Sequence, residues 1–194
     1  MIKILSGTLL SLLLVCQFAV AADDTSAEAV LKKNLAAVFA VLENKDLGQE
    51  TKSKEIVDIV TPMFDFSLMA KLTLGKKYWS GLTEEQKERF TQLFIKRLRT
   101  SYLGRLTLYT DEKVVYEPPV EKNRKVHIPT YLASKDRKIT ILYKFYDSEP
   151  GWKIYDLEIQ GVSIIRSYRA QFDQILQSGT FEDLLAKMEK SVAE

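Results

Sequence analysis

Residues 152–172 read WKIYDLEIQGVSIIRSYRAQF and decide the fold of the chain. The first part is rich in aromatic and branched side chains, which predicts a β-strand. Gly161 then allows a turn, and Ser163 is a suitable N-cap for a helix. The apolar residues that follow recur at helical spacing, namely Ile164, Ile165, Tyr168, Phe172 and Ile175. A strand and a helix are therefore expected to meet at a tight corner.

The chain before this corner divides into a helical half and a β half. Apolar spacing predicts helices within residues 30–42 and 54–60 and another after Asp65 or Ser67 that ends at Gly75. Thr83 and Gln86 form a capping box, and the apolar face of the helix that it opens is expected to continue to Tyr109. Near Thr110 the apolar period changes to two, which predicts four strands: 114–117, 125–133, 139–146 and 152–160. After the corner, helices are expected at 163–177 and beyond Thr180, so the order predicts an α+β domain.

The first 21 residues have the features of a secretory signal peptide. Lys3 precedes a short apolar stretch, and Ala19, Val20 and Ala21 form a small-x-small cleavage site. The apolar stretch is shorter than the roughly 20 residues of a membrane span. A lipoprotein signal ending in Cys16 is the alternative, but bulky Val15 argues against it. We therefore expect a signal peptide at 1–21 and a single domain at 22–194.

The composition leaves little material for catalysis or metal binding. Cys16 is the only cysteine and lies in the predicted signal, which excludes a disulfide, a thiol nucleophile or a cysteine metal site in the mature chain. His127 is the only histidine, so a site with several histidines is excluded. The net charge of +2 does not suggest a nucleic-acid partner. Since the chain also has no Gly-rich phosphate loop, we expect no metal and no cofactor.

Two carboxylates share one face of the last predicted strand. Asp156 and Glu158 are spaced as a general acid–base pair could be. Leu157 and Ile159 face the other way and are more typical of a core, which places both acids, like His127, on the solvated face of the sheet. An enzyme is therefore not expected, although an enzyme for a small hydrophobic ligand that uses Asp156 stays open.

Basic residues gather in small clusters, which include Lys96, Arg97 and Arg99 and also Arg166 and Arg169. Solvated faces explain most of them, and the functional alternative is docking to partner proteins or attraction to anionic head groups. The docking candidates are Arg97, Arg166 and Arg169. For Arg169, a buried salt bridge that anchors its helix to the sheet is an equal alternative.

Three segments together resemble the MlaC family, also called the toluene-tolerance family. They are the corner at 152–172, the segment 64–70 (FDFSLMA) with Leu74, Gly75 and Trp79, and the helix at 86–102. The resemblance covers essentially the whole mature chain. It implies a strongly curved antiparallel sheet of about four strands, wrapped by N- and C-terminal helices around an apolar cavity, in a roll related to nuclear transport factors.

The resemblance also implies a function, that of a periplasmic phospholipid carrier. Such carriers exchange lipid with an outer-membrane lipoprotein complex and with the substrate-binding ring of an inner-membrane ABC transporter, and so maintain outer-membrane lipid asymmetry. The expected lipid-binding residues are Phe64, Phe66, Met69, Phe94, Leu98, Tyr102, Tyr131, Ile141, Tyr143 and Ile164. A carrier of hopanoid-like or other hydrophobic ligands and a non-binding adaptor with a filled core remain alternatives.

Overall fold

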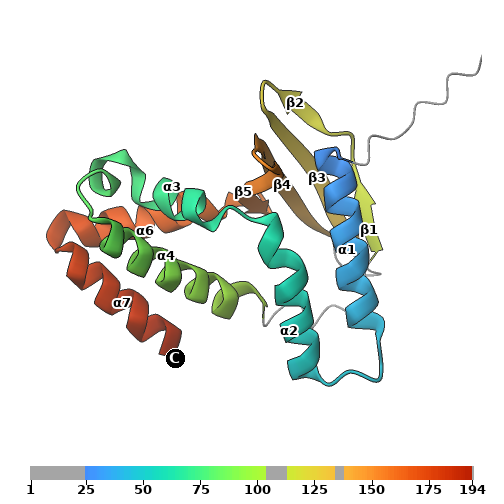
Figure 1. Ribbon diagram of the computed structural model, residues 1–194, viewed down its shortest axis with the longest axis horizontal. Helices are drawn as coiled ribbons and strands as arrows, with labels where there is room; N and C mark the ends of the chain where they lie inside the picture. Colours follow the sequence, from blue (N-terminus) through green and yellow to red (C-terminus); the bar gives the residue numbers. More distant parts are fainter. Residues whose placement is uncertain (1–24, 104–112, 134–137, 194) are drawn as a thin grey trace, which may run out of the picture.

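The computed structural model describes residues 25–103, 113–133 and 138–193, which fold into helices packed on a curved antiparallel sheet (Figure 1). The helices are α1 (Ala27–Glu43), α2 (Gln49–Val60), the short 3₁₀ helix η1 (Thr61–Met63), α3 (Phe66–Trp79), α4 (Glu84–Leu98), the π-helix η2 (Arg99–Leu103), α6 (Ile164–Ser178) and α7 (Phe181–Ala193). The strands are β1 (Lys113–Tyr116), β2 (Val120–Lys122), β3 (Lys125–Ala133), β4 (Lys138–Ser148), β5 (Gly151–Ile159) and β6 (Val162–Ser163). This confirms the predicted α+β class.

The sheet has the order β1-β3-β4-β5-β6, and β2 also pairs with β3. The described residues thus form six strands where four were predicted, because β2 and β6 have only three and two residues and carry no alternating pattern. Phe145 pairs with Ile154 while Lys144 pairs with Asp156, so Tyr155 is an extra residue in a β-bulge. The bulge lets Tyr155 and Asp156 both lie on the outer face of the sheet.

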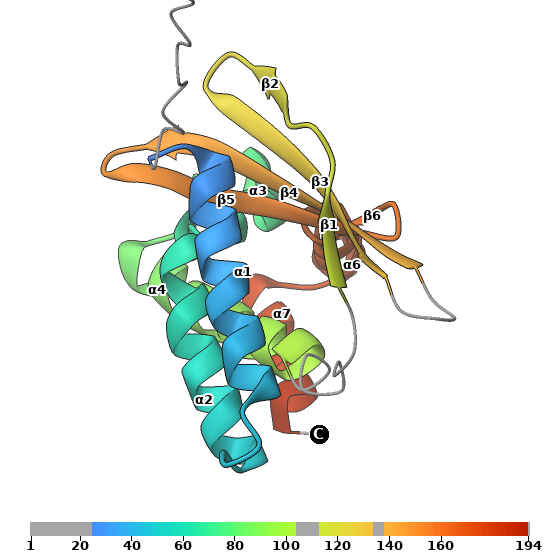
Figure 2. The same cartoon turned by 90° about the vertical axis from the view of Figure 1, so that its right-hand side faces the viewer.

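The two faces of the sheet differ sharply in polarity. On β3 the even-numbered residues Val126, Ile128 and Thr130 are buried, and their partners across β4 include Phe145 and Tyr143. Figure 2 shows α1 and α2 side by side, with α1 crossing the sheet. Ala27 and Leu31 of α1 pack into the same buried cluster as Val126, Ile128 and Phe145. This is the inner face, and the other face of the sheet is polar.

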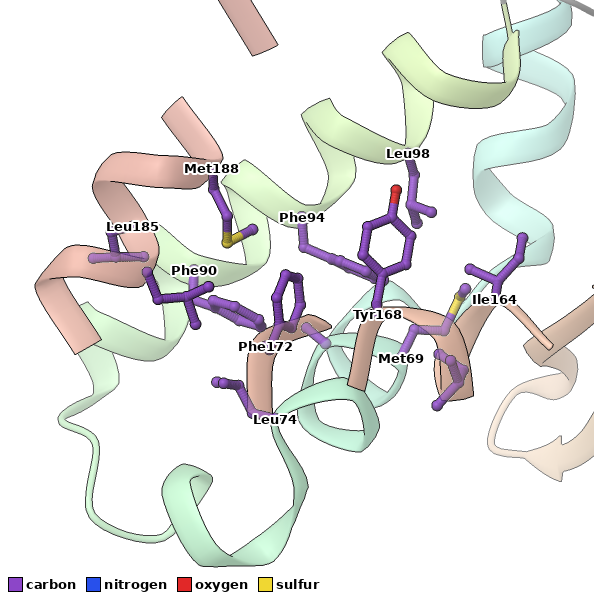
Figure 3. Packing of buried hydrophobic residues seen from close by; sticks show 13 residues of the cluster. Met69, Leu74, Phe90, Phe94, Leu98, Ile164, Tyr168, Phe172, Leu185 and Met188 are labelled. Atoms are coloured by element: carbon purple, nitrogen blue, oxygen red, sulfur yellow. The ribbon is translucent and has the colours of Figure 1, made fainter. Parts of the chain in front are cut away.

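Two separate apolar cores stabilise the chain. One joins α1, η1 and the inner face of the sheet through Ala27, Leu31, Met63, Val126, Ile128, Phe145 and Ile154. The other joins α3, α4, α6 and α7, and Figure 3 shows Phe90, Phe94, Tyr168 and Phe172 meeting inside it. Phe64 and Leu157 pack against both cores. Phe64 and Leu157 thus mark the boundary between the two cores, and the candidate site lies at this boundary.

Local signals in the sequence correctly predicted most helix starts. Asp65 accepts a hydrogen bond from the Leu68 amide at 2.8 Å and caps α3. Thr83 and Gln86 form the predicted capping box of α4. Ser163 accepts a hydrogen bond from the Arg166 amide at 3.1 Å and caps α6, as the corner sequence predicts. These caps depend on residues three positions apart, which explains why the sequence reveals them.

Two predictions for the helical half need correction. The helix that was expected to run to Tyr109 leaves the α conformation after Leu98 and continues as the π-helix η2. Tyr109, like the predicted signal at 1–21, lies outside the described residues. Gly75 does not end α3 but kinks it, with φ of 69°. A β-carbon at this position would lie 2.1 Å from Nη2 of Arg169, so the two residues meet closely.

We expect Gly75→Ala to destabilise the protein by about 1–3 kcal/mol, because φ of 69° with ψ of 164° is a backbone conformation that residues with a β-carbon adopt only under strain. The Arg169 guanidinium is the flexible end of a side chain and can move away from the new β-carbon. The strained backbone is therefore the main cause of the expected loss of stability. Urea unfolding should therefore give the same loss in an Arg169→Ala background. Gly48→Ala is the control, because Gly48 has φ of −68° and its β-carbon would meet nothing within 4 Å. Full recovery of stability by Arg169→Ala would show that the contact, and not the backbone, is responsible.

Candidate functional site

An apolar cavity of about 210 Å³ lies at the boundary between the two cores. Met69, Leu98 and Ile164 from the helical core form one part of its wall, and Met63 and Ile154 from the sheet core form another. For comparison, an engineered apolar cavity of about 150 Å³ stays dry and binds benzene. The cavity therefore has the size and chemistry to take a hydrophobic ligand.

Helical residues and the inner face of the sheet build the wall. Helix α1 contributes Leu35, Val38, Phe39 and Leu42, four residues at the spacing of one helical face. Phe64 and Phe66, which flank the N-cap of α3, stack on each other with ring centroids 5.4 Å apart. Strands β3, β4 and β5 contribute alternate residues, namely Leu132, Ile141, Tyr143, Ile154, Leu157 and Ile159. Nearly every group that faces the cavity is thus a hydrocarbon.

Few polar groups line this cavity. Burial, with a smaller effect of neighbouring Tyr116, raises the pKa of Tyr143, so its hydroxyl is uncharged at neutral pH. Tyr102 adds a second hydroxyl, and Thr61 and Arg99 complete the lining. The wall contains no carboxylate among the residues that the structure describes. An apolar ligand with few polar groups fits such a site better than a sugar or a nucleotide does.

Eight of the ten residues predicted to bind ligand line this cavity: Phe64, Phe66, Met69, Leu98, Tyr102, Ile141, Tyr143 and Ile164. Two do not. Phe94 is fully buried in the helical core, where it contacts Phe90 and Tyr168. Tyr131 pairs with Thr140 and lies on the outer face of the sheet, with the Lys138 ammonium 4.0 Å from its ring centre. Its apolar character suggested the cavity, but the alternation along β3 places Leu132 there instead.

Sequence reasoning missed the contribution of α1 to the cavity. The periodicity revealed the apolar face with Leu35, Val38, Phe39 and Leu42 but not what it packs against, because that depends on contacts far along the chain. Leu157 and Ile159 were assigned to a core, and they line the cavity on β5. The predicted helix and the predicted sheet each have a continuous apolar face. Pairing these two faces is the signal that could have placed α1 and β5 around one cavity.

The outer face of the sheet holds a polar cluster at the corner between β5 and α6. Lys144 Nζ lies 2.9 Å from Asp156 Oδ2 and 3.0 Å from Glu158 Oε2. Asp156 also accepts hydrogen bonds from the Ser163 hydroxyl at 2.8 Å and from the Ile165 amide at 3.2 Å. Burial by itself lowers the pKa of Lys144, but the two carboxylates outweigh it and raise the pKa. The ammonium therefore stays charged at neutral pH.

The burial of Asp156 corrects a prediction. Both acids do lie on the outer face, as alternation predicts, but Asp156 is only 5% exposed and is not solvated. The reason is the corner itself, since β6 and the first turn of α6 fold back over this carboxylate. Lys144, Ser163 and the Ile165 amide occupy this carboxylate, which suits a structural tie between sheet and helix better than a general acid or base.

His127 also lies on the outer face, as predicted, but it is partly buried and its Nε2 is 3.0 Å from the Tyr155 hydroxyl. Burial, together with the nearby charges of Lys144 and Lys125, lowers the pKa of His127. The ring is therefore neutral at pH 7. Within residues 25–103, 113–133 and 138–193, no group of three or more histidine, cysteine or acidic side chains could hold a metal ion.

The three arginines predicted to dock partners have different surroundings. Arg97 of α4 donates a hydrogen bond to the Ser191 hydroxyl of α7, and its guanidinium lies 5.6 Å from the Tyr168 ring centre. Arg166 is 72% exposed, with a loose ion pair to Glu158 at 3.3 Å. Arg169 is exposed and lies over Gly75, and the described residues give it no ion pair, so the proposed salt bridge to the sheet is absent there. Arg166 and Arg169 are thus the freer pair, one turn apart on α6.

Comparisons with known proteins agree with one another. The family described as MlaC protein matches residues 32–190. The intermembrane phospholipid transport system binding protein MlaC of Haemophilus influenzae is 24% identical over 139 residues, which are 69% of this chain and 64% of that protein. The match thus spans a little under two thirds of the length of this relative.

A solved structure is also similar. It is a phospholipid-binding protein from Ralstonia solanacearum in complex with a phospholipid, 26% identical to this chain, with a TM-score of 0.79. The similarity covers 87% of this chain and 97% of that one. In the part of this chain that the structure describes, no helix is both long enough and apolar enough to cross a membrane.

Proposed function

The chain belongs to the MlaC protein family, and on this premise we propose that it carries phospholipid between membranes with the acyl chains in its apolar cavity. The observation that carries the proposal is the lining of that cavity, which is almost wholly hydrocarbon and joins two otherwise closed cores. The similar Ralstonia protein was solved with a phospholipid bound, and the Haemophilus relative is named for intermembrane phospholipid transport. Both support the same ligand class.

Simple energetics explain why such a carrier is needed. Exposing a methylene to water costs about 0.8 kcal/mol, so two chains of ~15 methylenes face a barrier of about 24 kcal/mol. A barrier of this height gives an escape rate of roughly 10⁻⁵ per second. Unaided transfer through water thus takes on the order of a day per lipid. A protein that covers part of the acyl chains with apolar side chains lowers this barrier.

Carriage of lipid requires no catalytic residue, because no bond is formed or broken. The polar cluster around Asp156 is consistent with this, since its carboxylate is occupied by Lys144, Ser163 and the α6 amide. We propose that the protein is not an enzyme. The ligand is then held by many apolar contacts, each worth about 1–3 kcal/mol, with the head group near solvent.

We further propose that the carrier works in the periplasm as a single domain at 22–194, after removal of a signal at 1–21. An outer-membrane lipoprotein complex and the substrate-binding ring of an inner-membrane ABC transporter are the proposed partners. The name of the Haemophilus relative, a binding protein of a transport system, supports them. Arg97, Arg166 and Arg169 stay the candidates for docking, and the exposure of Arg166 suits this role.

We expect the purified mature protein to speed transfer of a labelled phospholipid between donor vesicles and vesicles that hold the partner complexes. Glu158→Ala and His127→Ala should each transfer lipid within a few-fold of the wild type, whereas loss of a general acid or base costs about 10²–10⁴ in rate. Thermal unfolding of each variant checks its fold. A hundredfold loss in a folded variant would favour an enzyme of hydrophobic ligands over a carrier.

A further inference from the structure

Arg99 is the only charged side chain in the cavity wall, among the residues that the structure describes. It is the first residue of the π-helix η2, directly after Leu98, whose side chain Figure 3 shows at the end of α4. Isolated π turns are rare and are found frequently at functional sites. Leu98 at the end of α4 and Arg99 and Tyr102 of η2 all line the cavity, so one cation lies beside an otherwise largely apolar wall.

The guanidinium of Arg99 has donors to spare. Among the described residues, it donates one hydrogen bond, from Nη2 to the Thr61 hydroxyl oxygen at 3.5 Å, which is at the long limit for such a bond. The Thr61 hydroxyl donates its proton to the Val57 carbonyl at 2.6 Å and can still accept from Arg99, so this contact occupies at most one of the five guanidinium donors. Within the described part of the chain, the ion pairs include no carboxylate partner for Arg99. The side chain is exposed, so Arg99 stands where the cavity meets solvent.

We propose that Arg99 binds the phosphate of the bound phospholipid, which is the first charged group beyond its acyl chains. This inference rests on the proposed function, because it assumes that the chains occupy the cavity. A planar guanidinium suits a phosphate through two parallel hydrogen bonds. The η2 segment thus fixes which end of the lipid faces out, and it makes the site selective for lipids that carry a phosphate.

The test compares a phospholipid with a diacylglycerol of the same chains, since the two differ by the phosphate and the head group. Binding of each to the mature protein is measured by displacement of a fluorescent lipid. The wild type is expected to prefer the phospholipid by roughly tenfold or more, as for a charge-assisted hydrogen bond. Arg99→Gln should reduce this preference to within threefold without weakening binding of the diacylglycerol. Arg99→Lys keeps the charge but loses the two parallel hydrogen bonds, so its preference should lie between those of the wild type and Arg99→Gln.

Lys96→Gln is the matched control, because Lys96 is exposed on the last turn of α4 and does not line the cavity. It removes the same charge and should leave the preference unchanged. The ³¹P resonance of the bound lipid should shift in Arg99→Gln and not in Lys96→Gln, a signal that a purely structural role would not move. Glycerol phosphate, which has the anion without the chains, should not compete at millimolar concentration.

The role of Arg99 is overturned if the wild type binds both lipids equally or if Arg99→Gln keeps the preference for phospholipid. Either result leaves the proposed carrier function intact. An equal loss in Lys96→Gln means that general surface charge is responsible and also overturns it. Tight competition by glycerol phosphate would assign the arginine to a soluble phosphate instead. If the wild type binds neither lipid, the proposed function itself fails.

Discussion

Replacing Asp156 with alanine is expected to destabilise the protein by about 3 kcal/mol, the lower end of the range for removing one partner of a buried ion pair. The side chain of Asp156 is 7% exposed and that of Lys144 is 14% exposed, so water replaces the lost carboxylate only in part. Lys144 keeps its contact with Glu158 at 3.0 Å, which limits the damage. The Ile165 amide also loses an acceptor, and the corner between β5 and α6 loses its tie.

Urea unfolding at pH 7 measures this effect, and Glu158→Ala is its control. The Glu158 side chain contacts the same ammonium but is 23% exposed, so its loss should cost about 1 kcal/mol or less. The loss of stability in Asp156→Asn should lie between the losses in Asp156→Ala and Glu158→Ala. Its amide oxygen can still accept a hydrogen bond from the Ile165 amide, but it does not neutralise the charge of Lys144. Equal losses for Asp156→Ala and Glu158→Ala would mean that the buried pair does not hold the corner together.

Ile141→Trp is expected to lower phospholipid affinity by about 50-fold while changing stability by less than about 1 kcal/mol. The side chain of Ile141 faces the cavity, so a larger group takes space meant for ligand. If it displaces about three methylenes at ~0.8 kcal/mol each, the loss is about 2.4 kcal/mol. Tyr143→Trp, two positions along the same strand, should act in the same direction. Displacement of a fluorescent lipid gives the affinity and urea unfolding gives the stability.

Phe145→Trp is the matched control, on the same strand and the same face of the sheet. Phe145 is fully buried in the sheet core and does not line the cavity. Overpacking a closed core costs about 1–3 kcal/mol, so this variant should lose stability first. If instead Ile141→Trp unfolds the protein and binding per folded molecule is unchanged, then Ile141 belongs to a core and the cavity wall is assigned wrongly.

The sequence predicted those parts of the fold that depend on neighbouring residues. The capping box of Thr83 and Gln86 and the cap at Ser163 use residues three positions apart. The period of two predicted for residues 139–146 agrees with β4, where Ile141 and Tyr143 both line the cavity. The family resemblance, and not the periodicity, supplied the cavity between sheet and helices.

What failed depends on contacts between distant parts of the chain. Asp156 is buried because β6 and α6 fold back over it, and no local pattern around a carboxylate reveals that. Phe94 has the same apolar character as the cavity residues, yet it packs against Tyr168 from another helix. For Tyr131 the aromatic character favours the cavity, but the alternation along β3 places it opposite to the buried residues Val126, Ile128 and Thr130.

The most direct test of the central claim is to identify what the cavity holds. The mature protein, purified from the periplasm of a Gram-negative host, is extracted with organic solvent, and the extract is analysed by mass spectrometry. We predict co-purified phospholipid in near-stoichiometric amount in the wild type and a large loss of it in Ile141→Trp. A folded wild-type protein that carries no phospholipid and takes up none from vesicles would contradict the account.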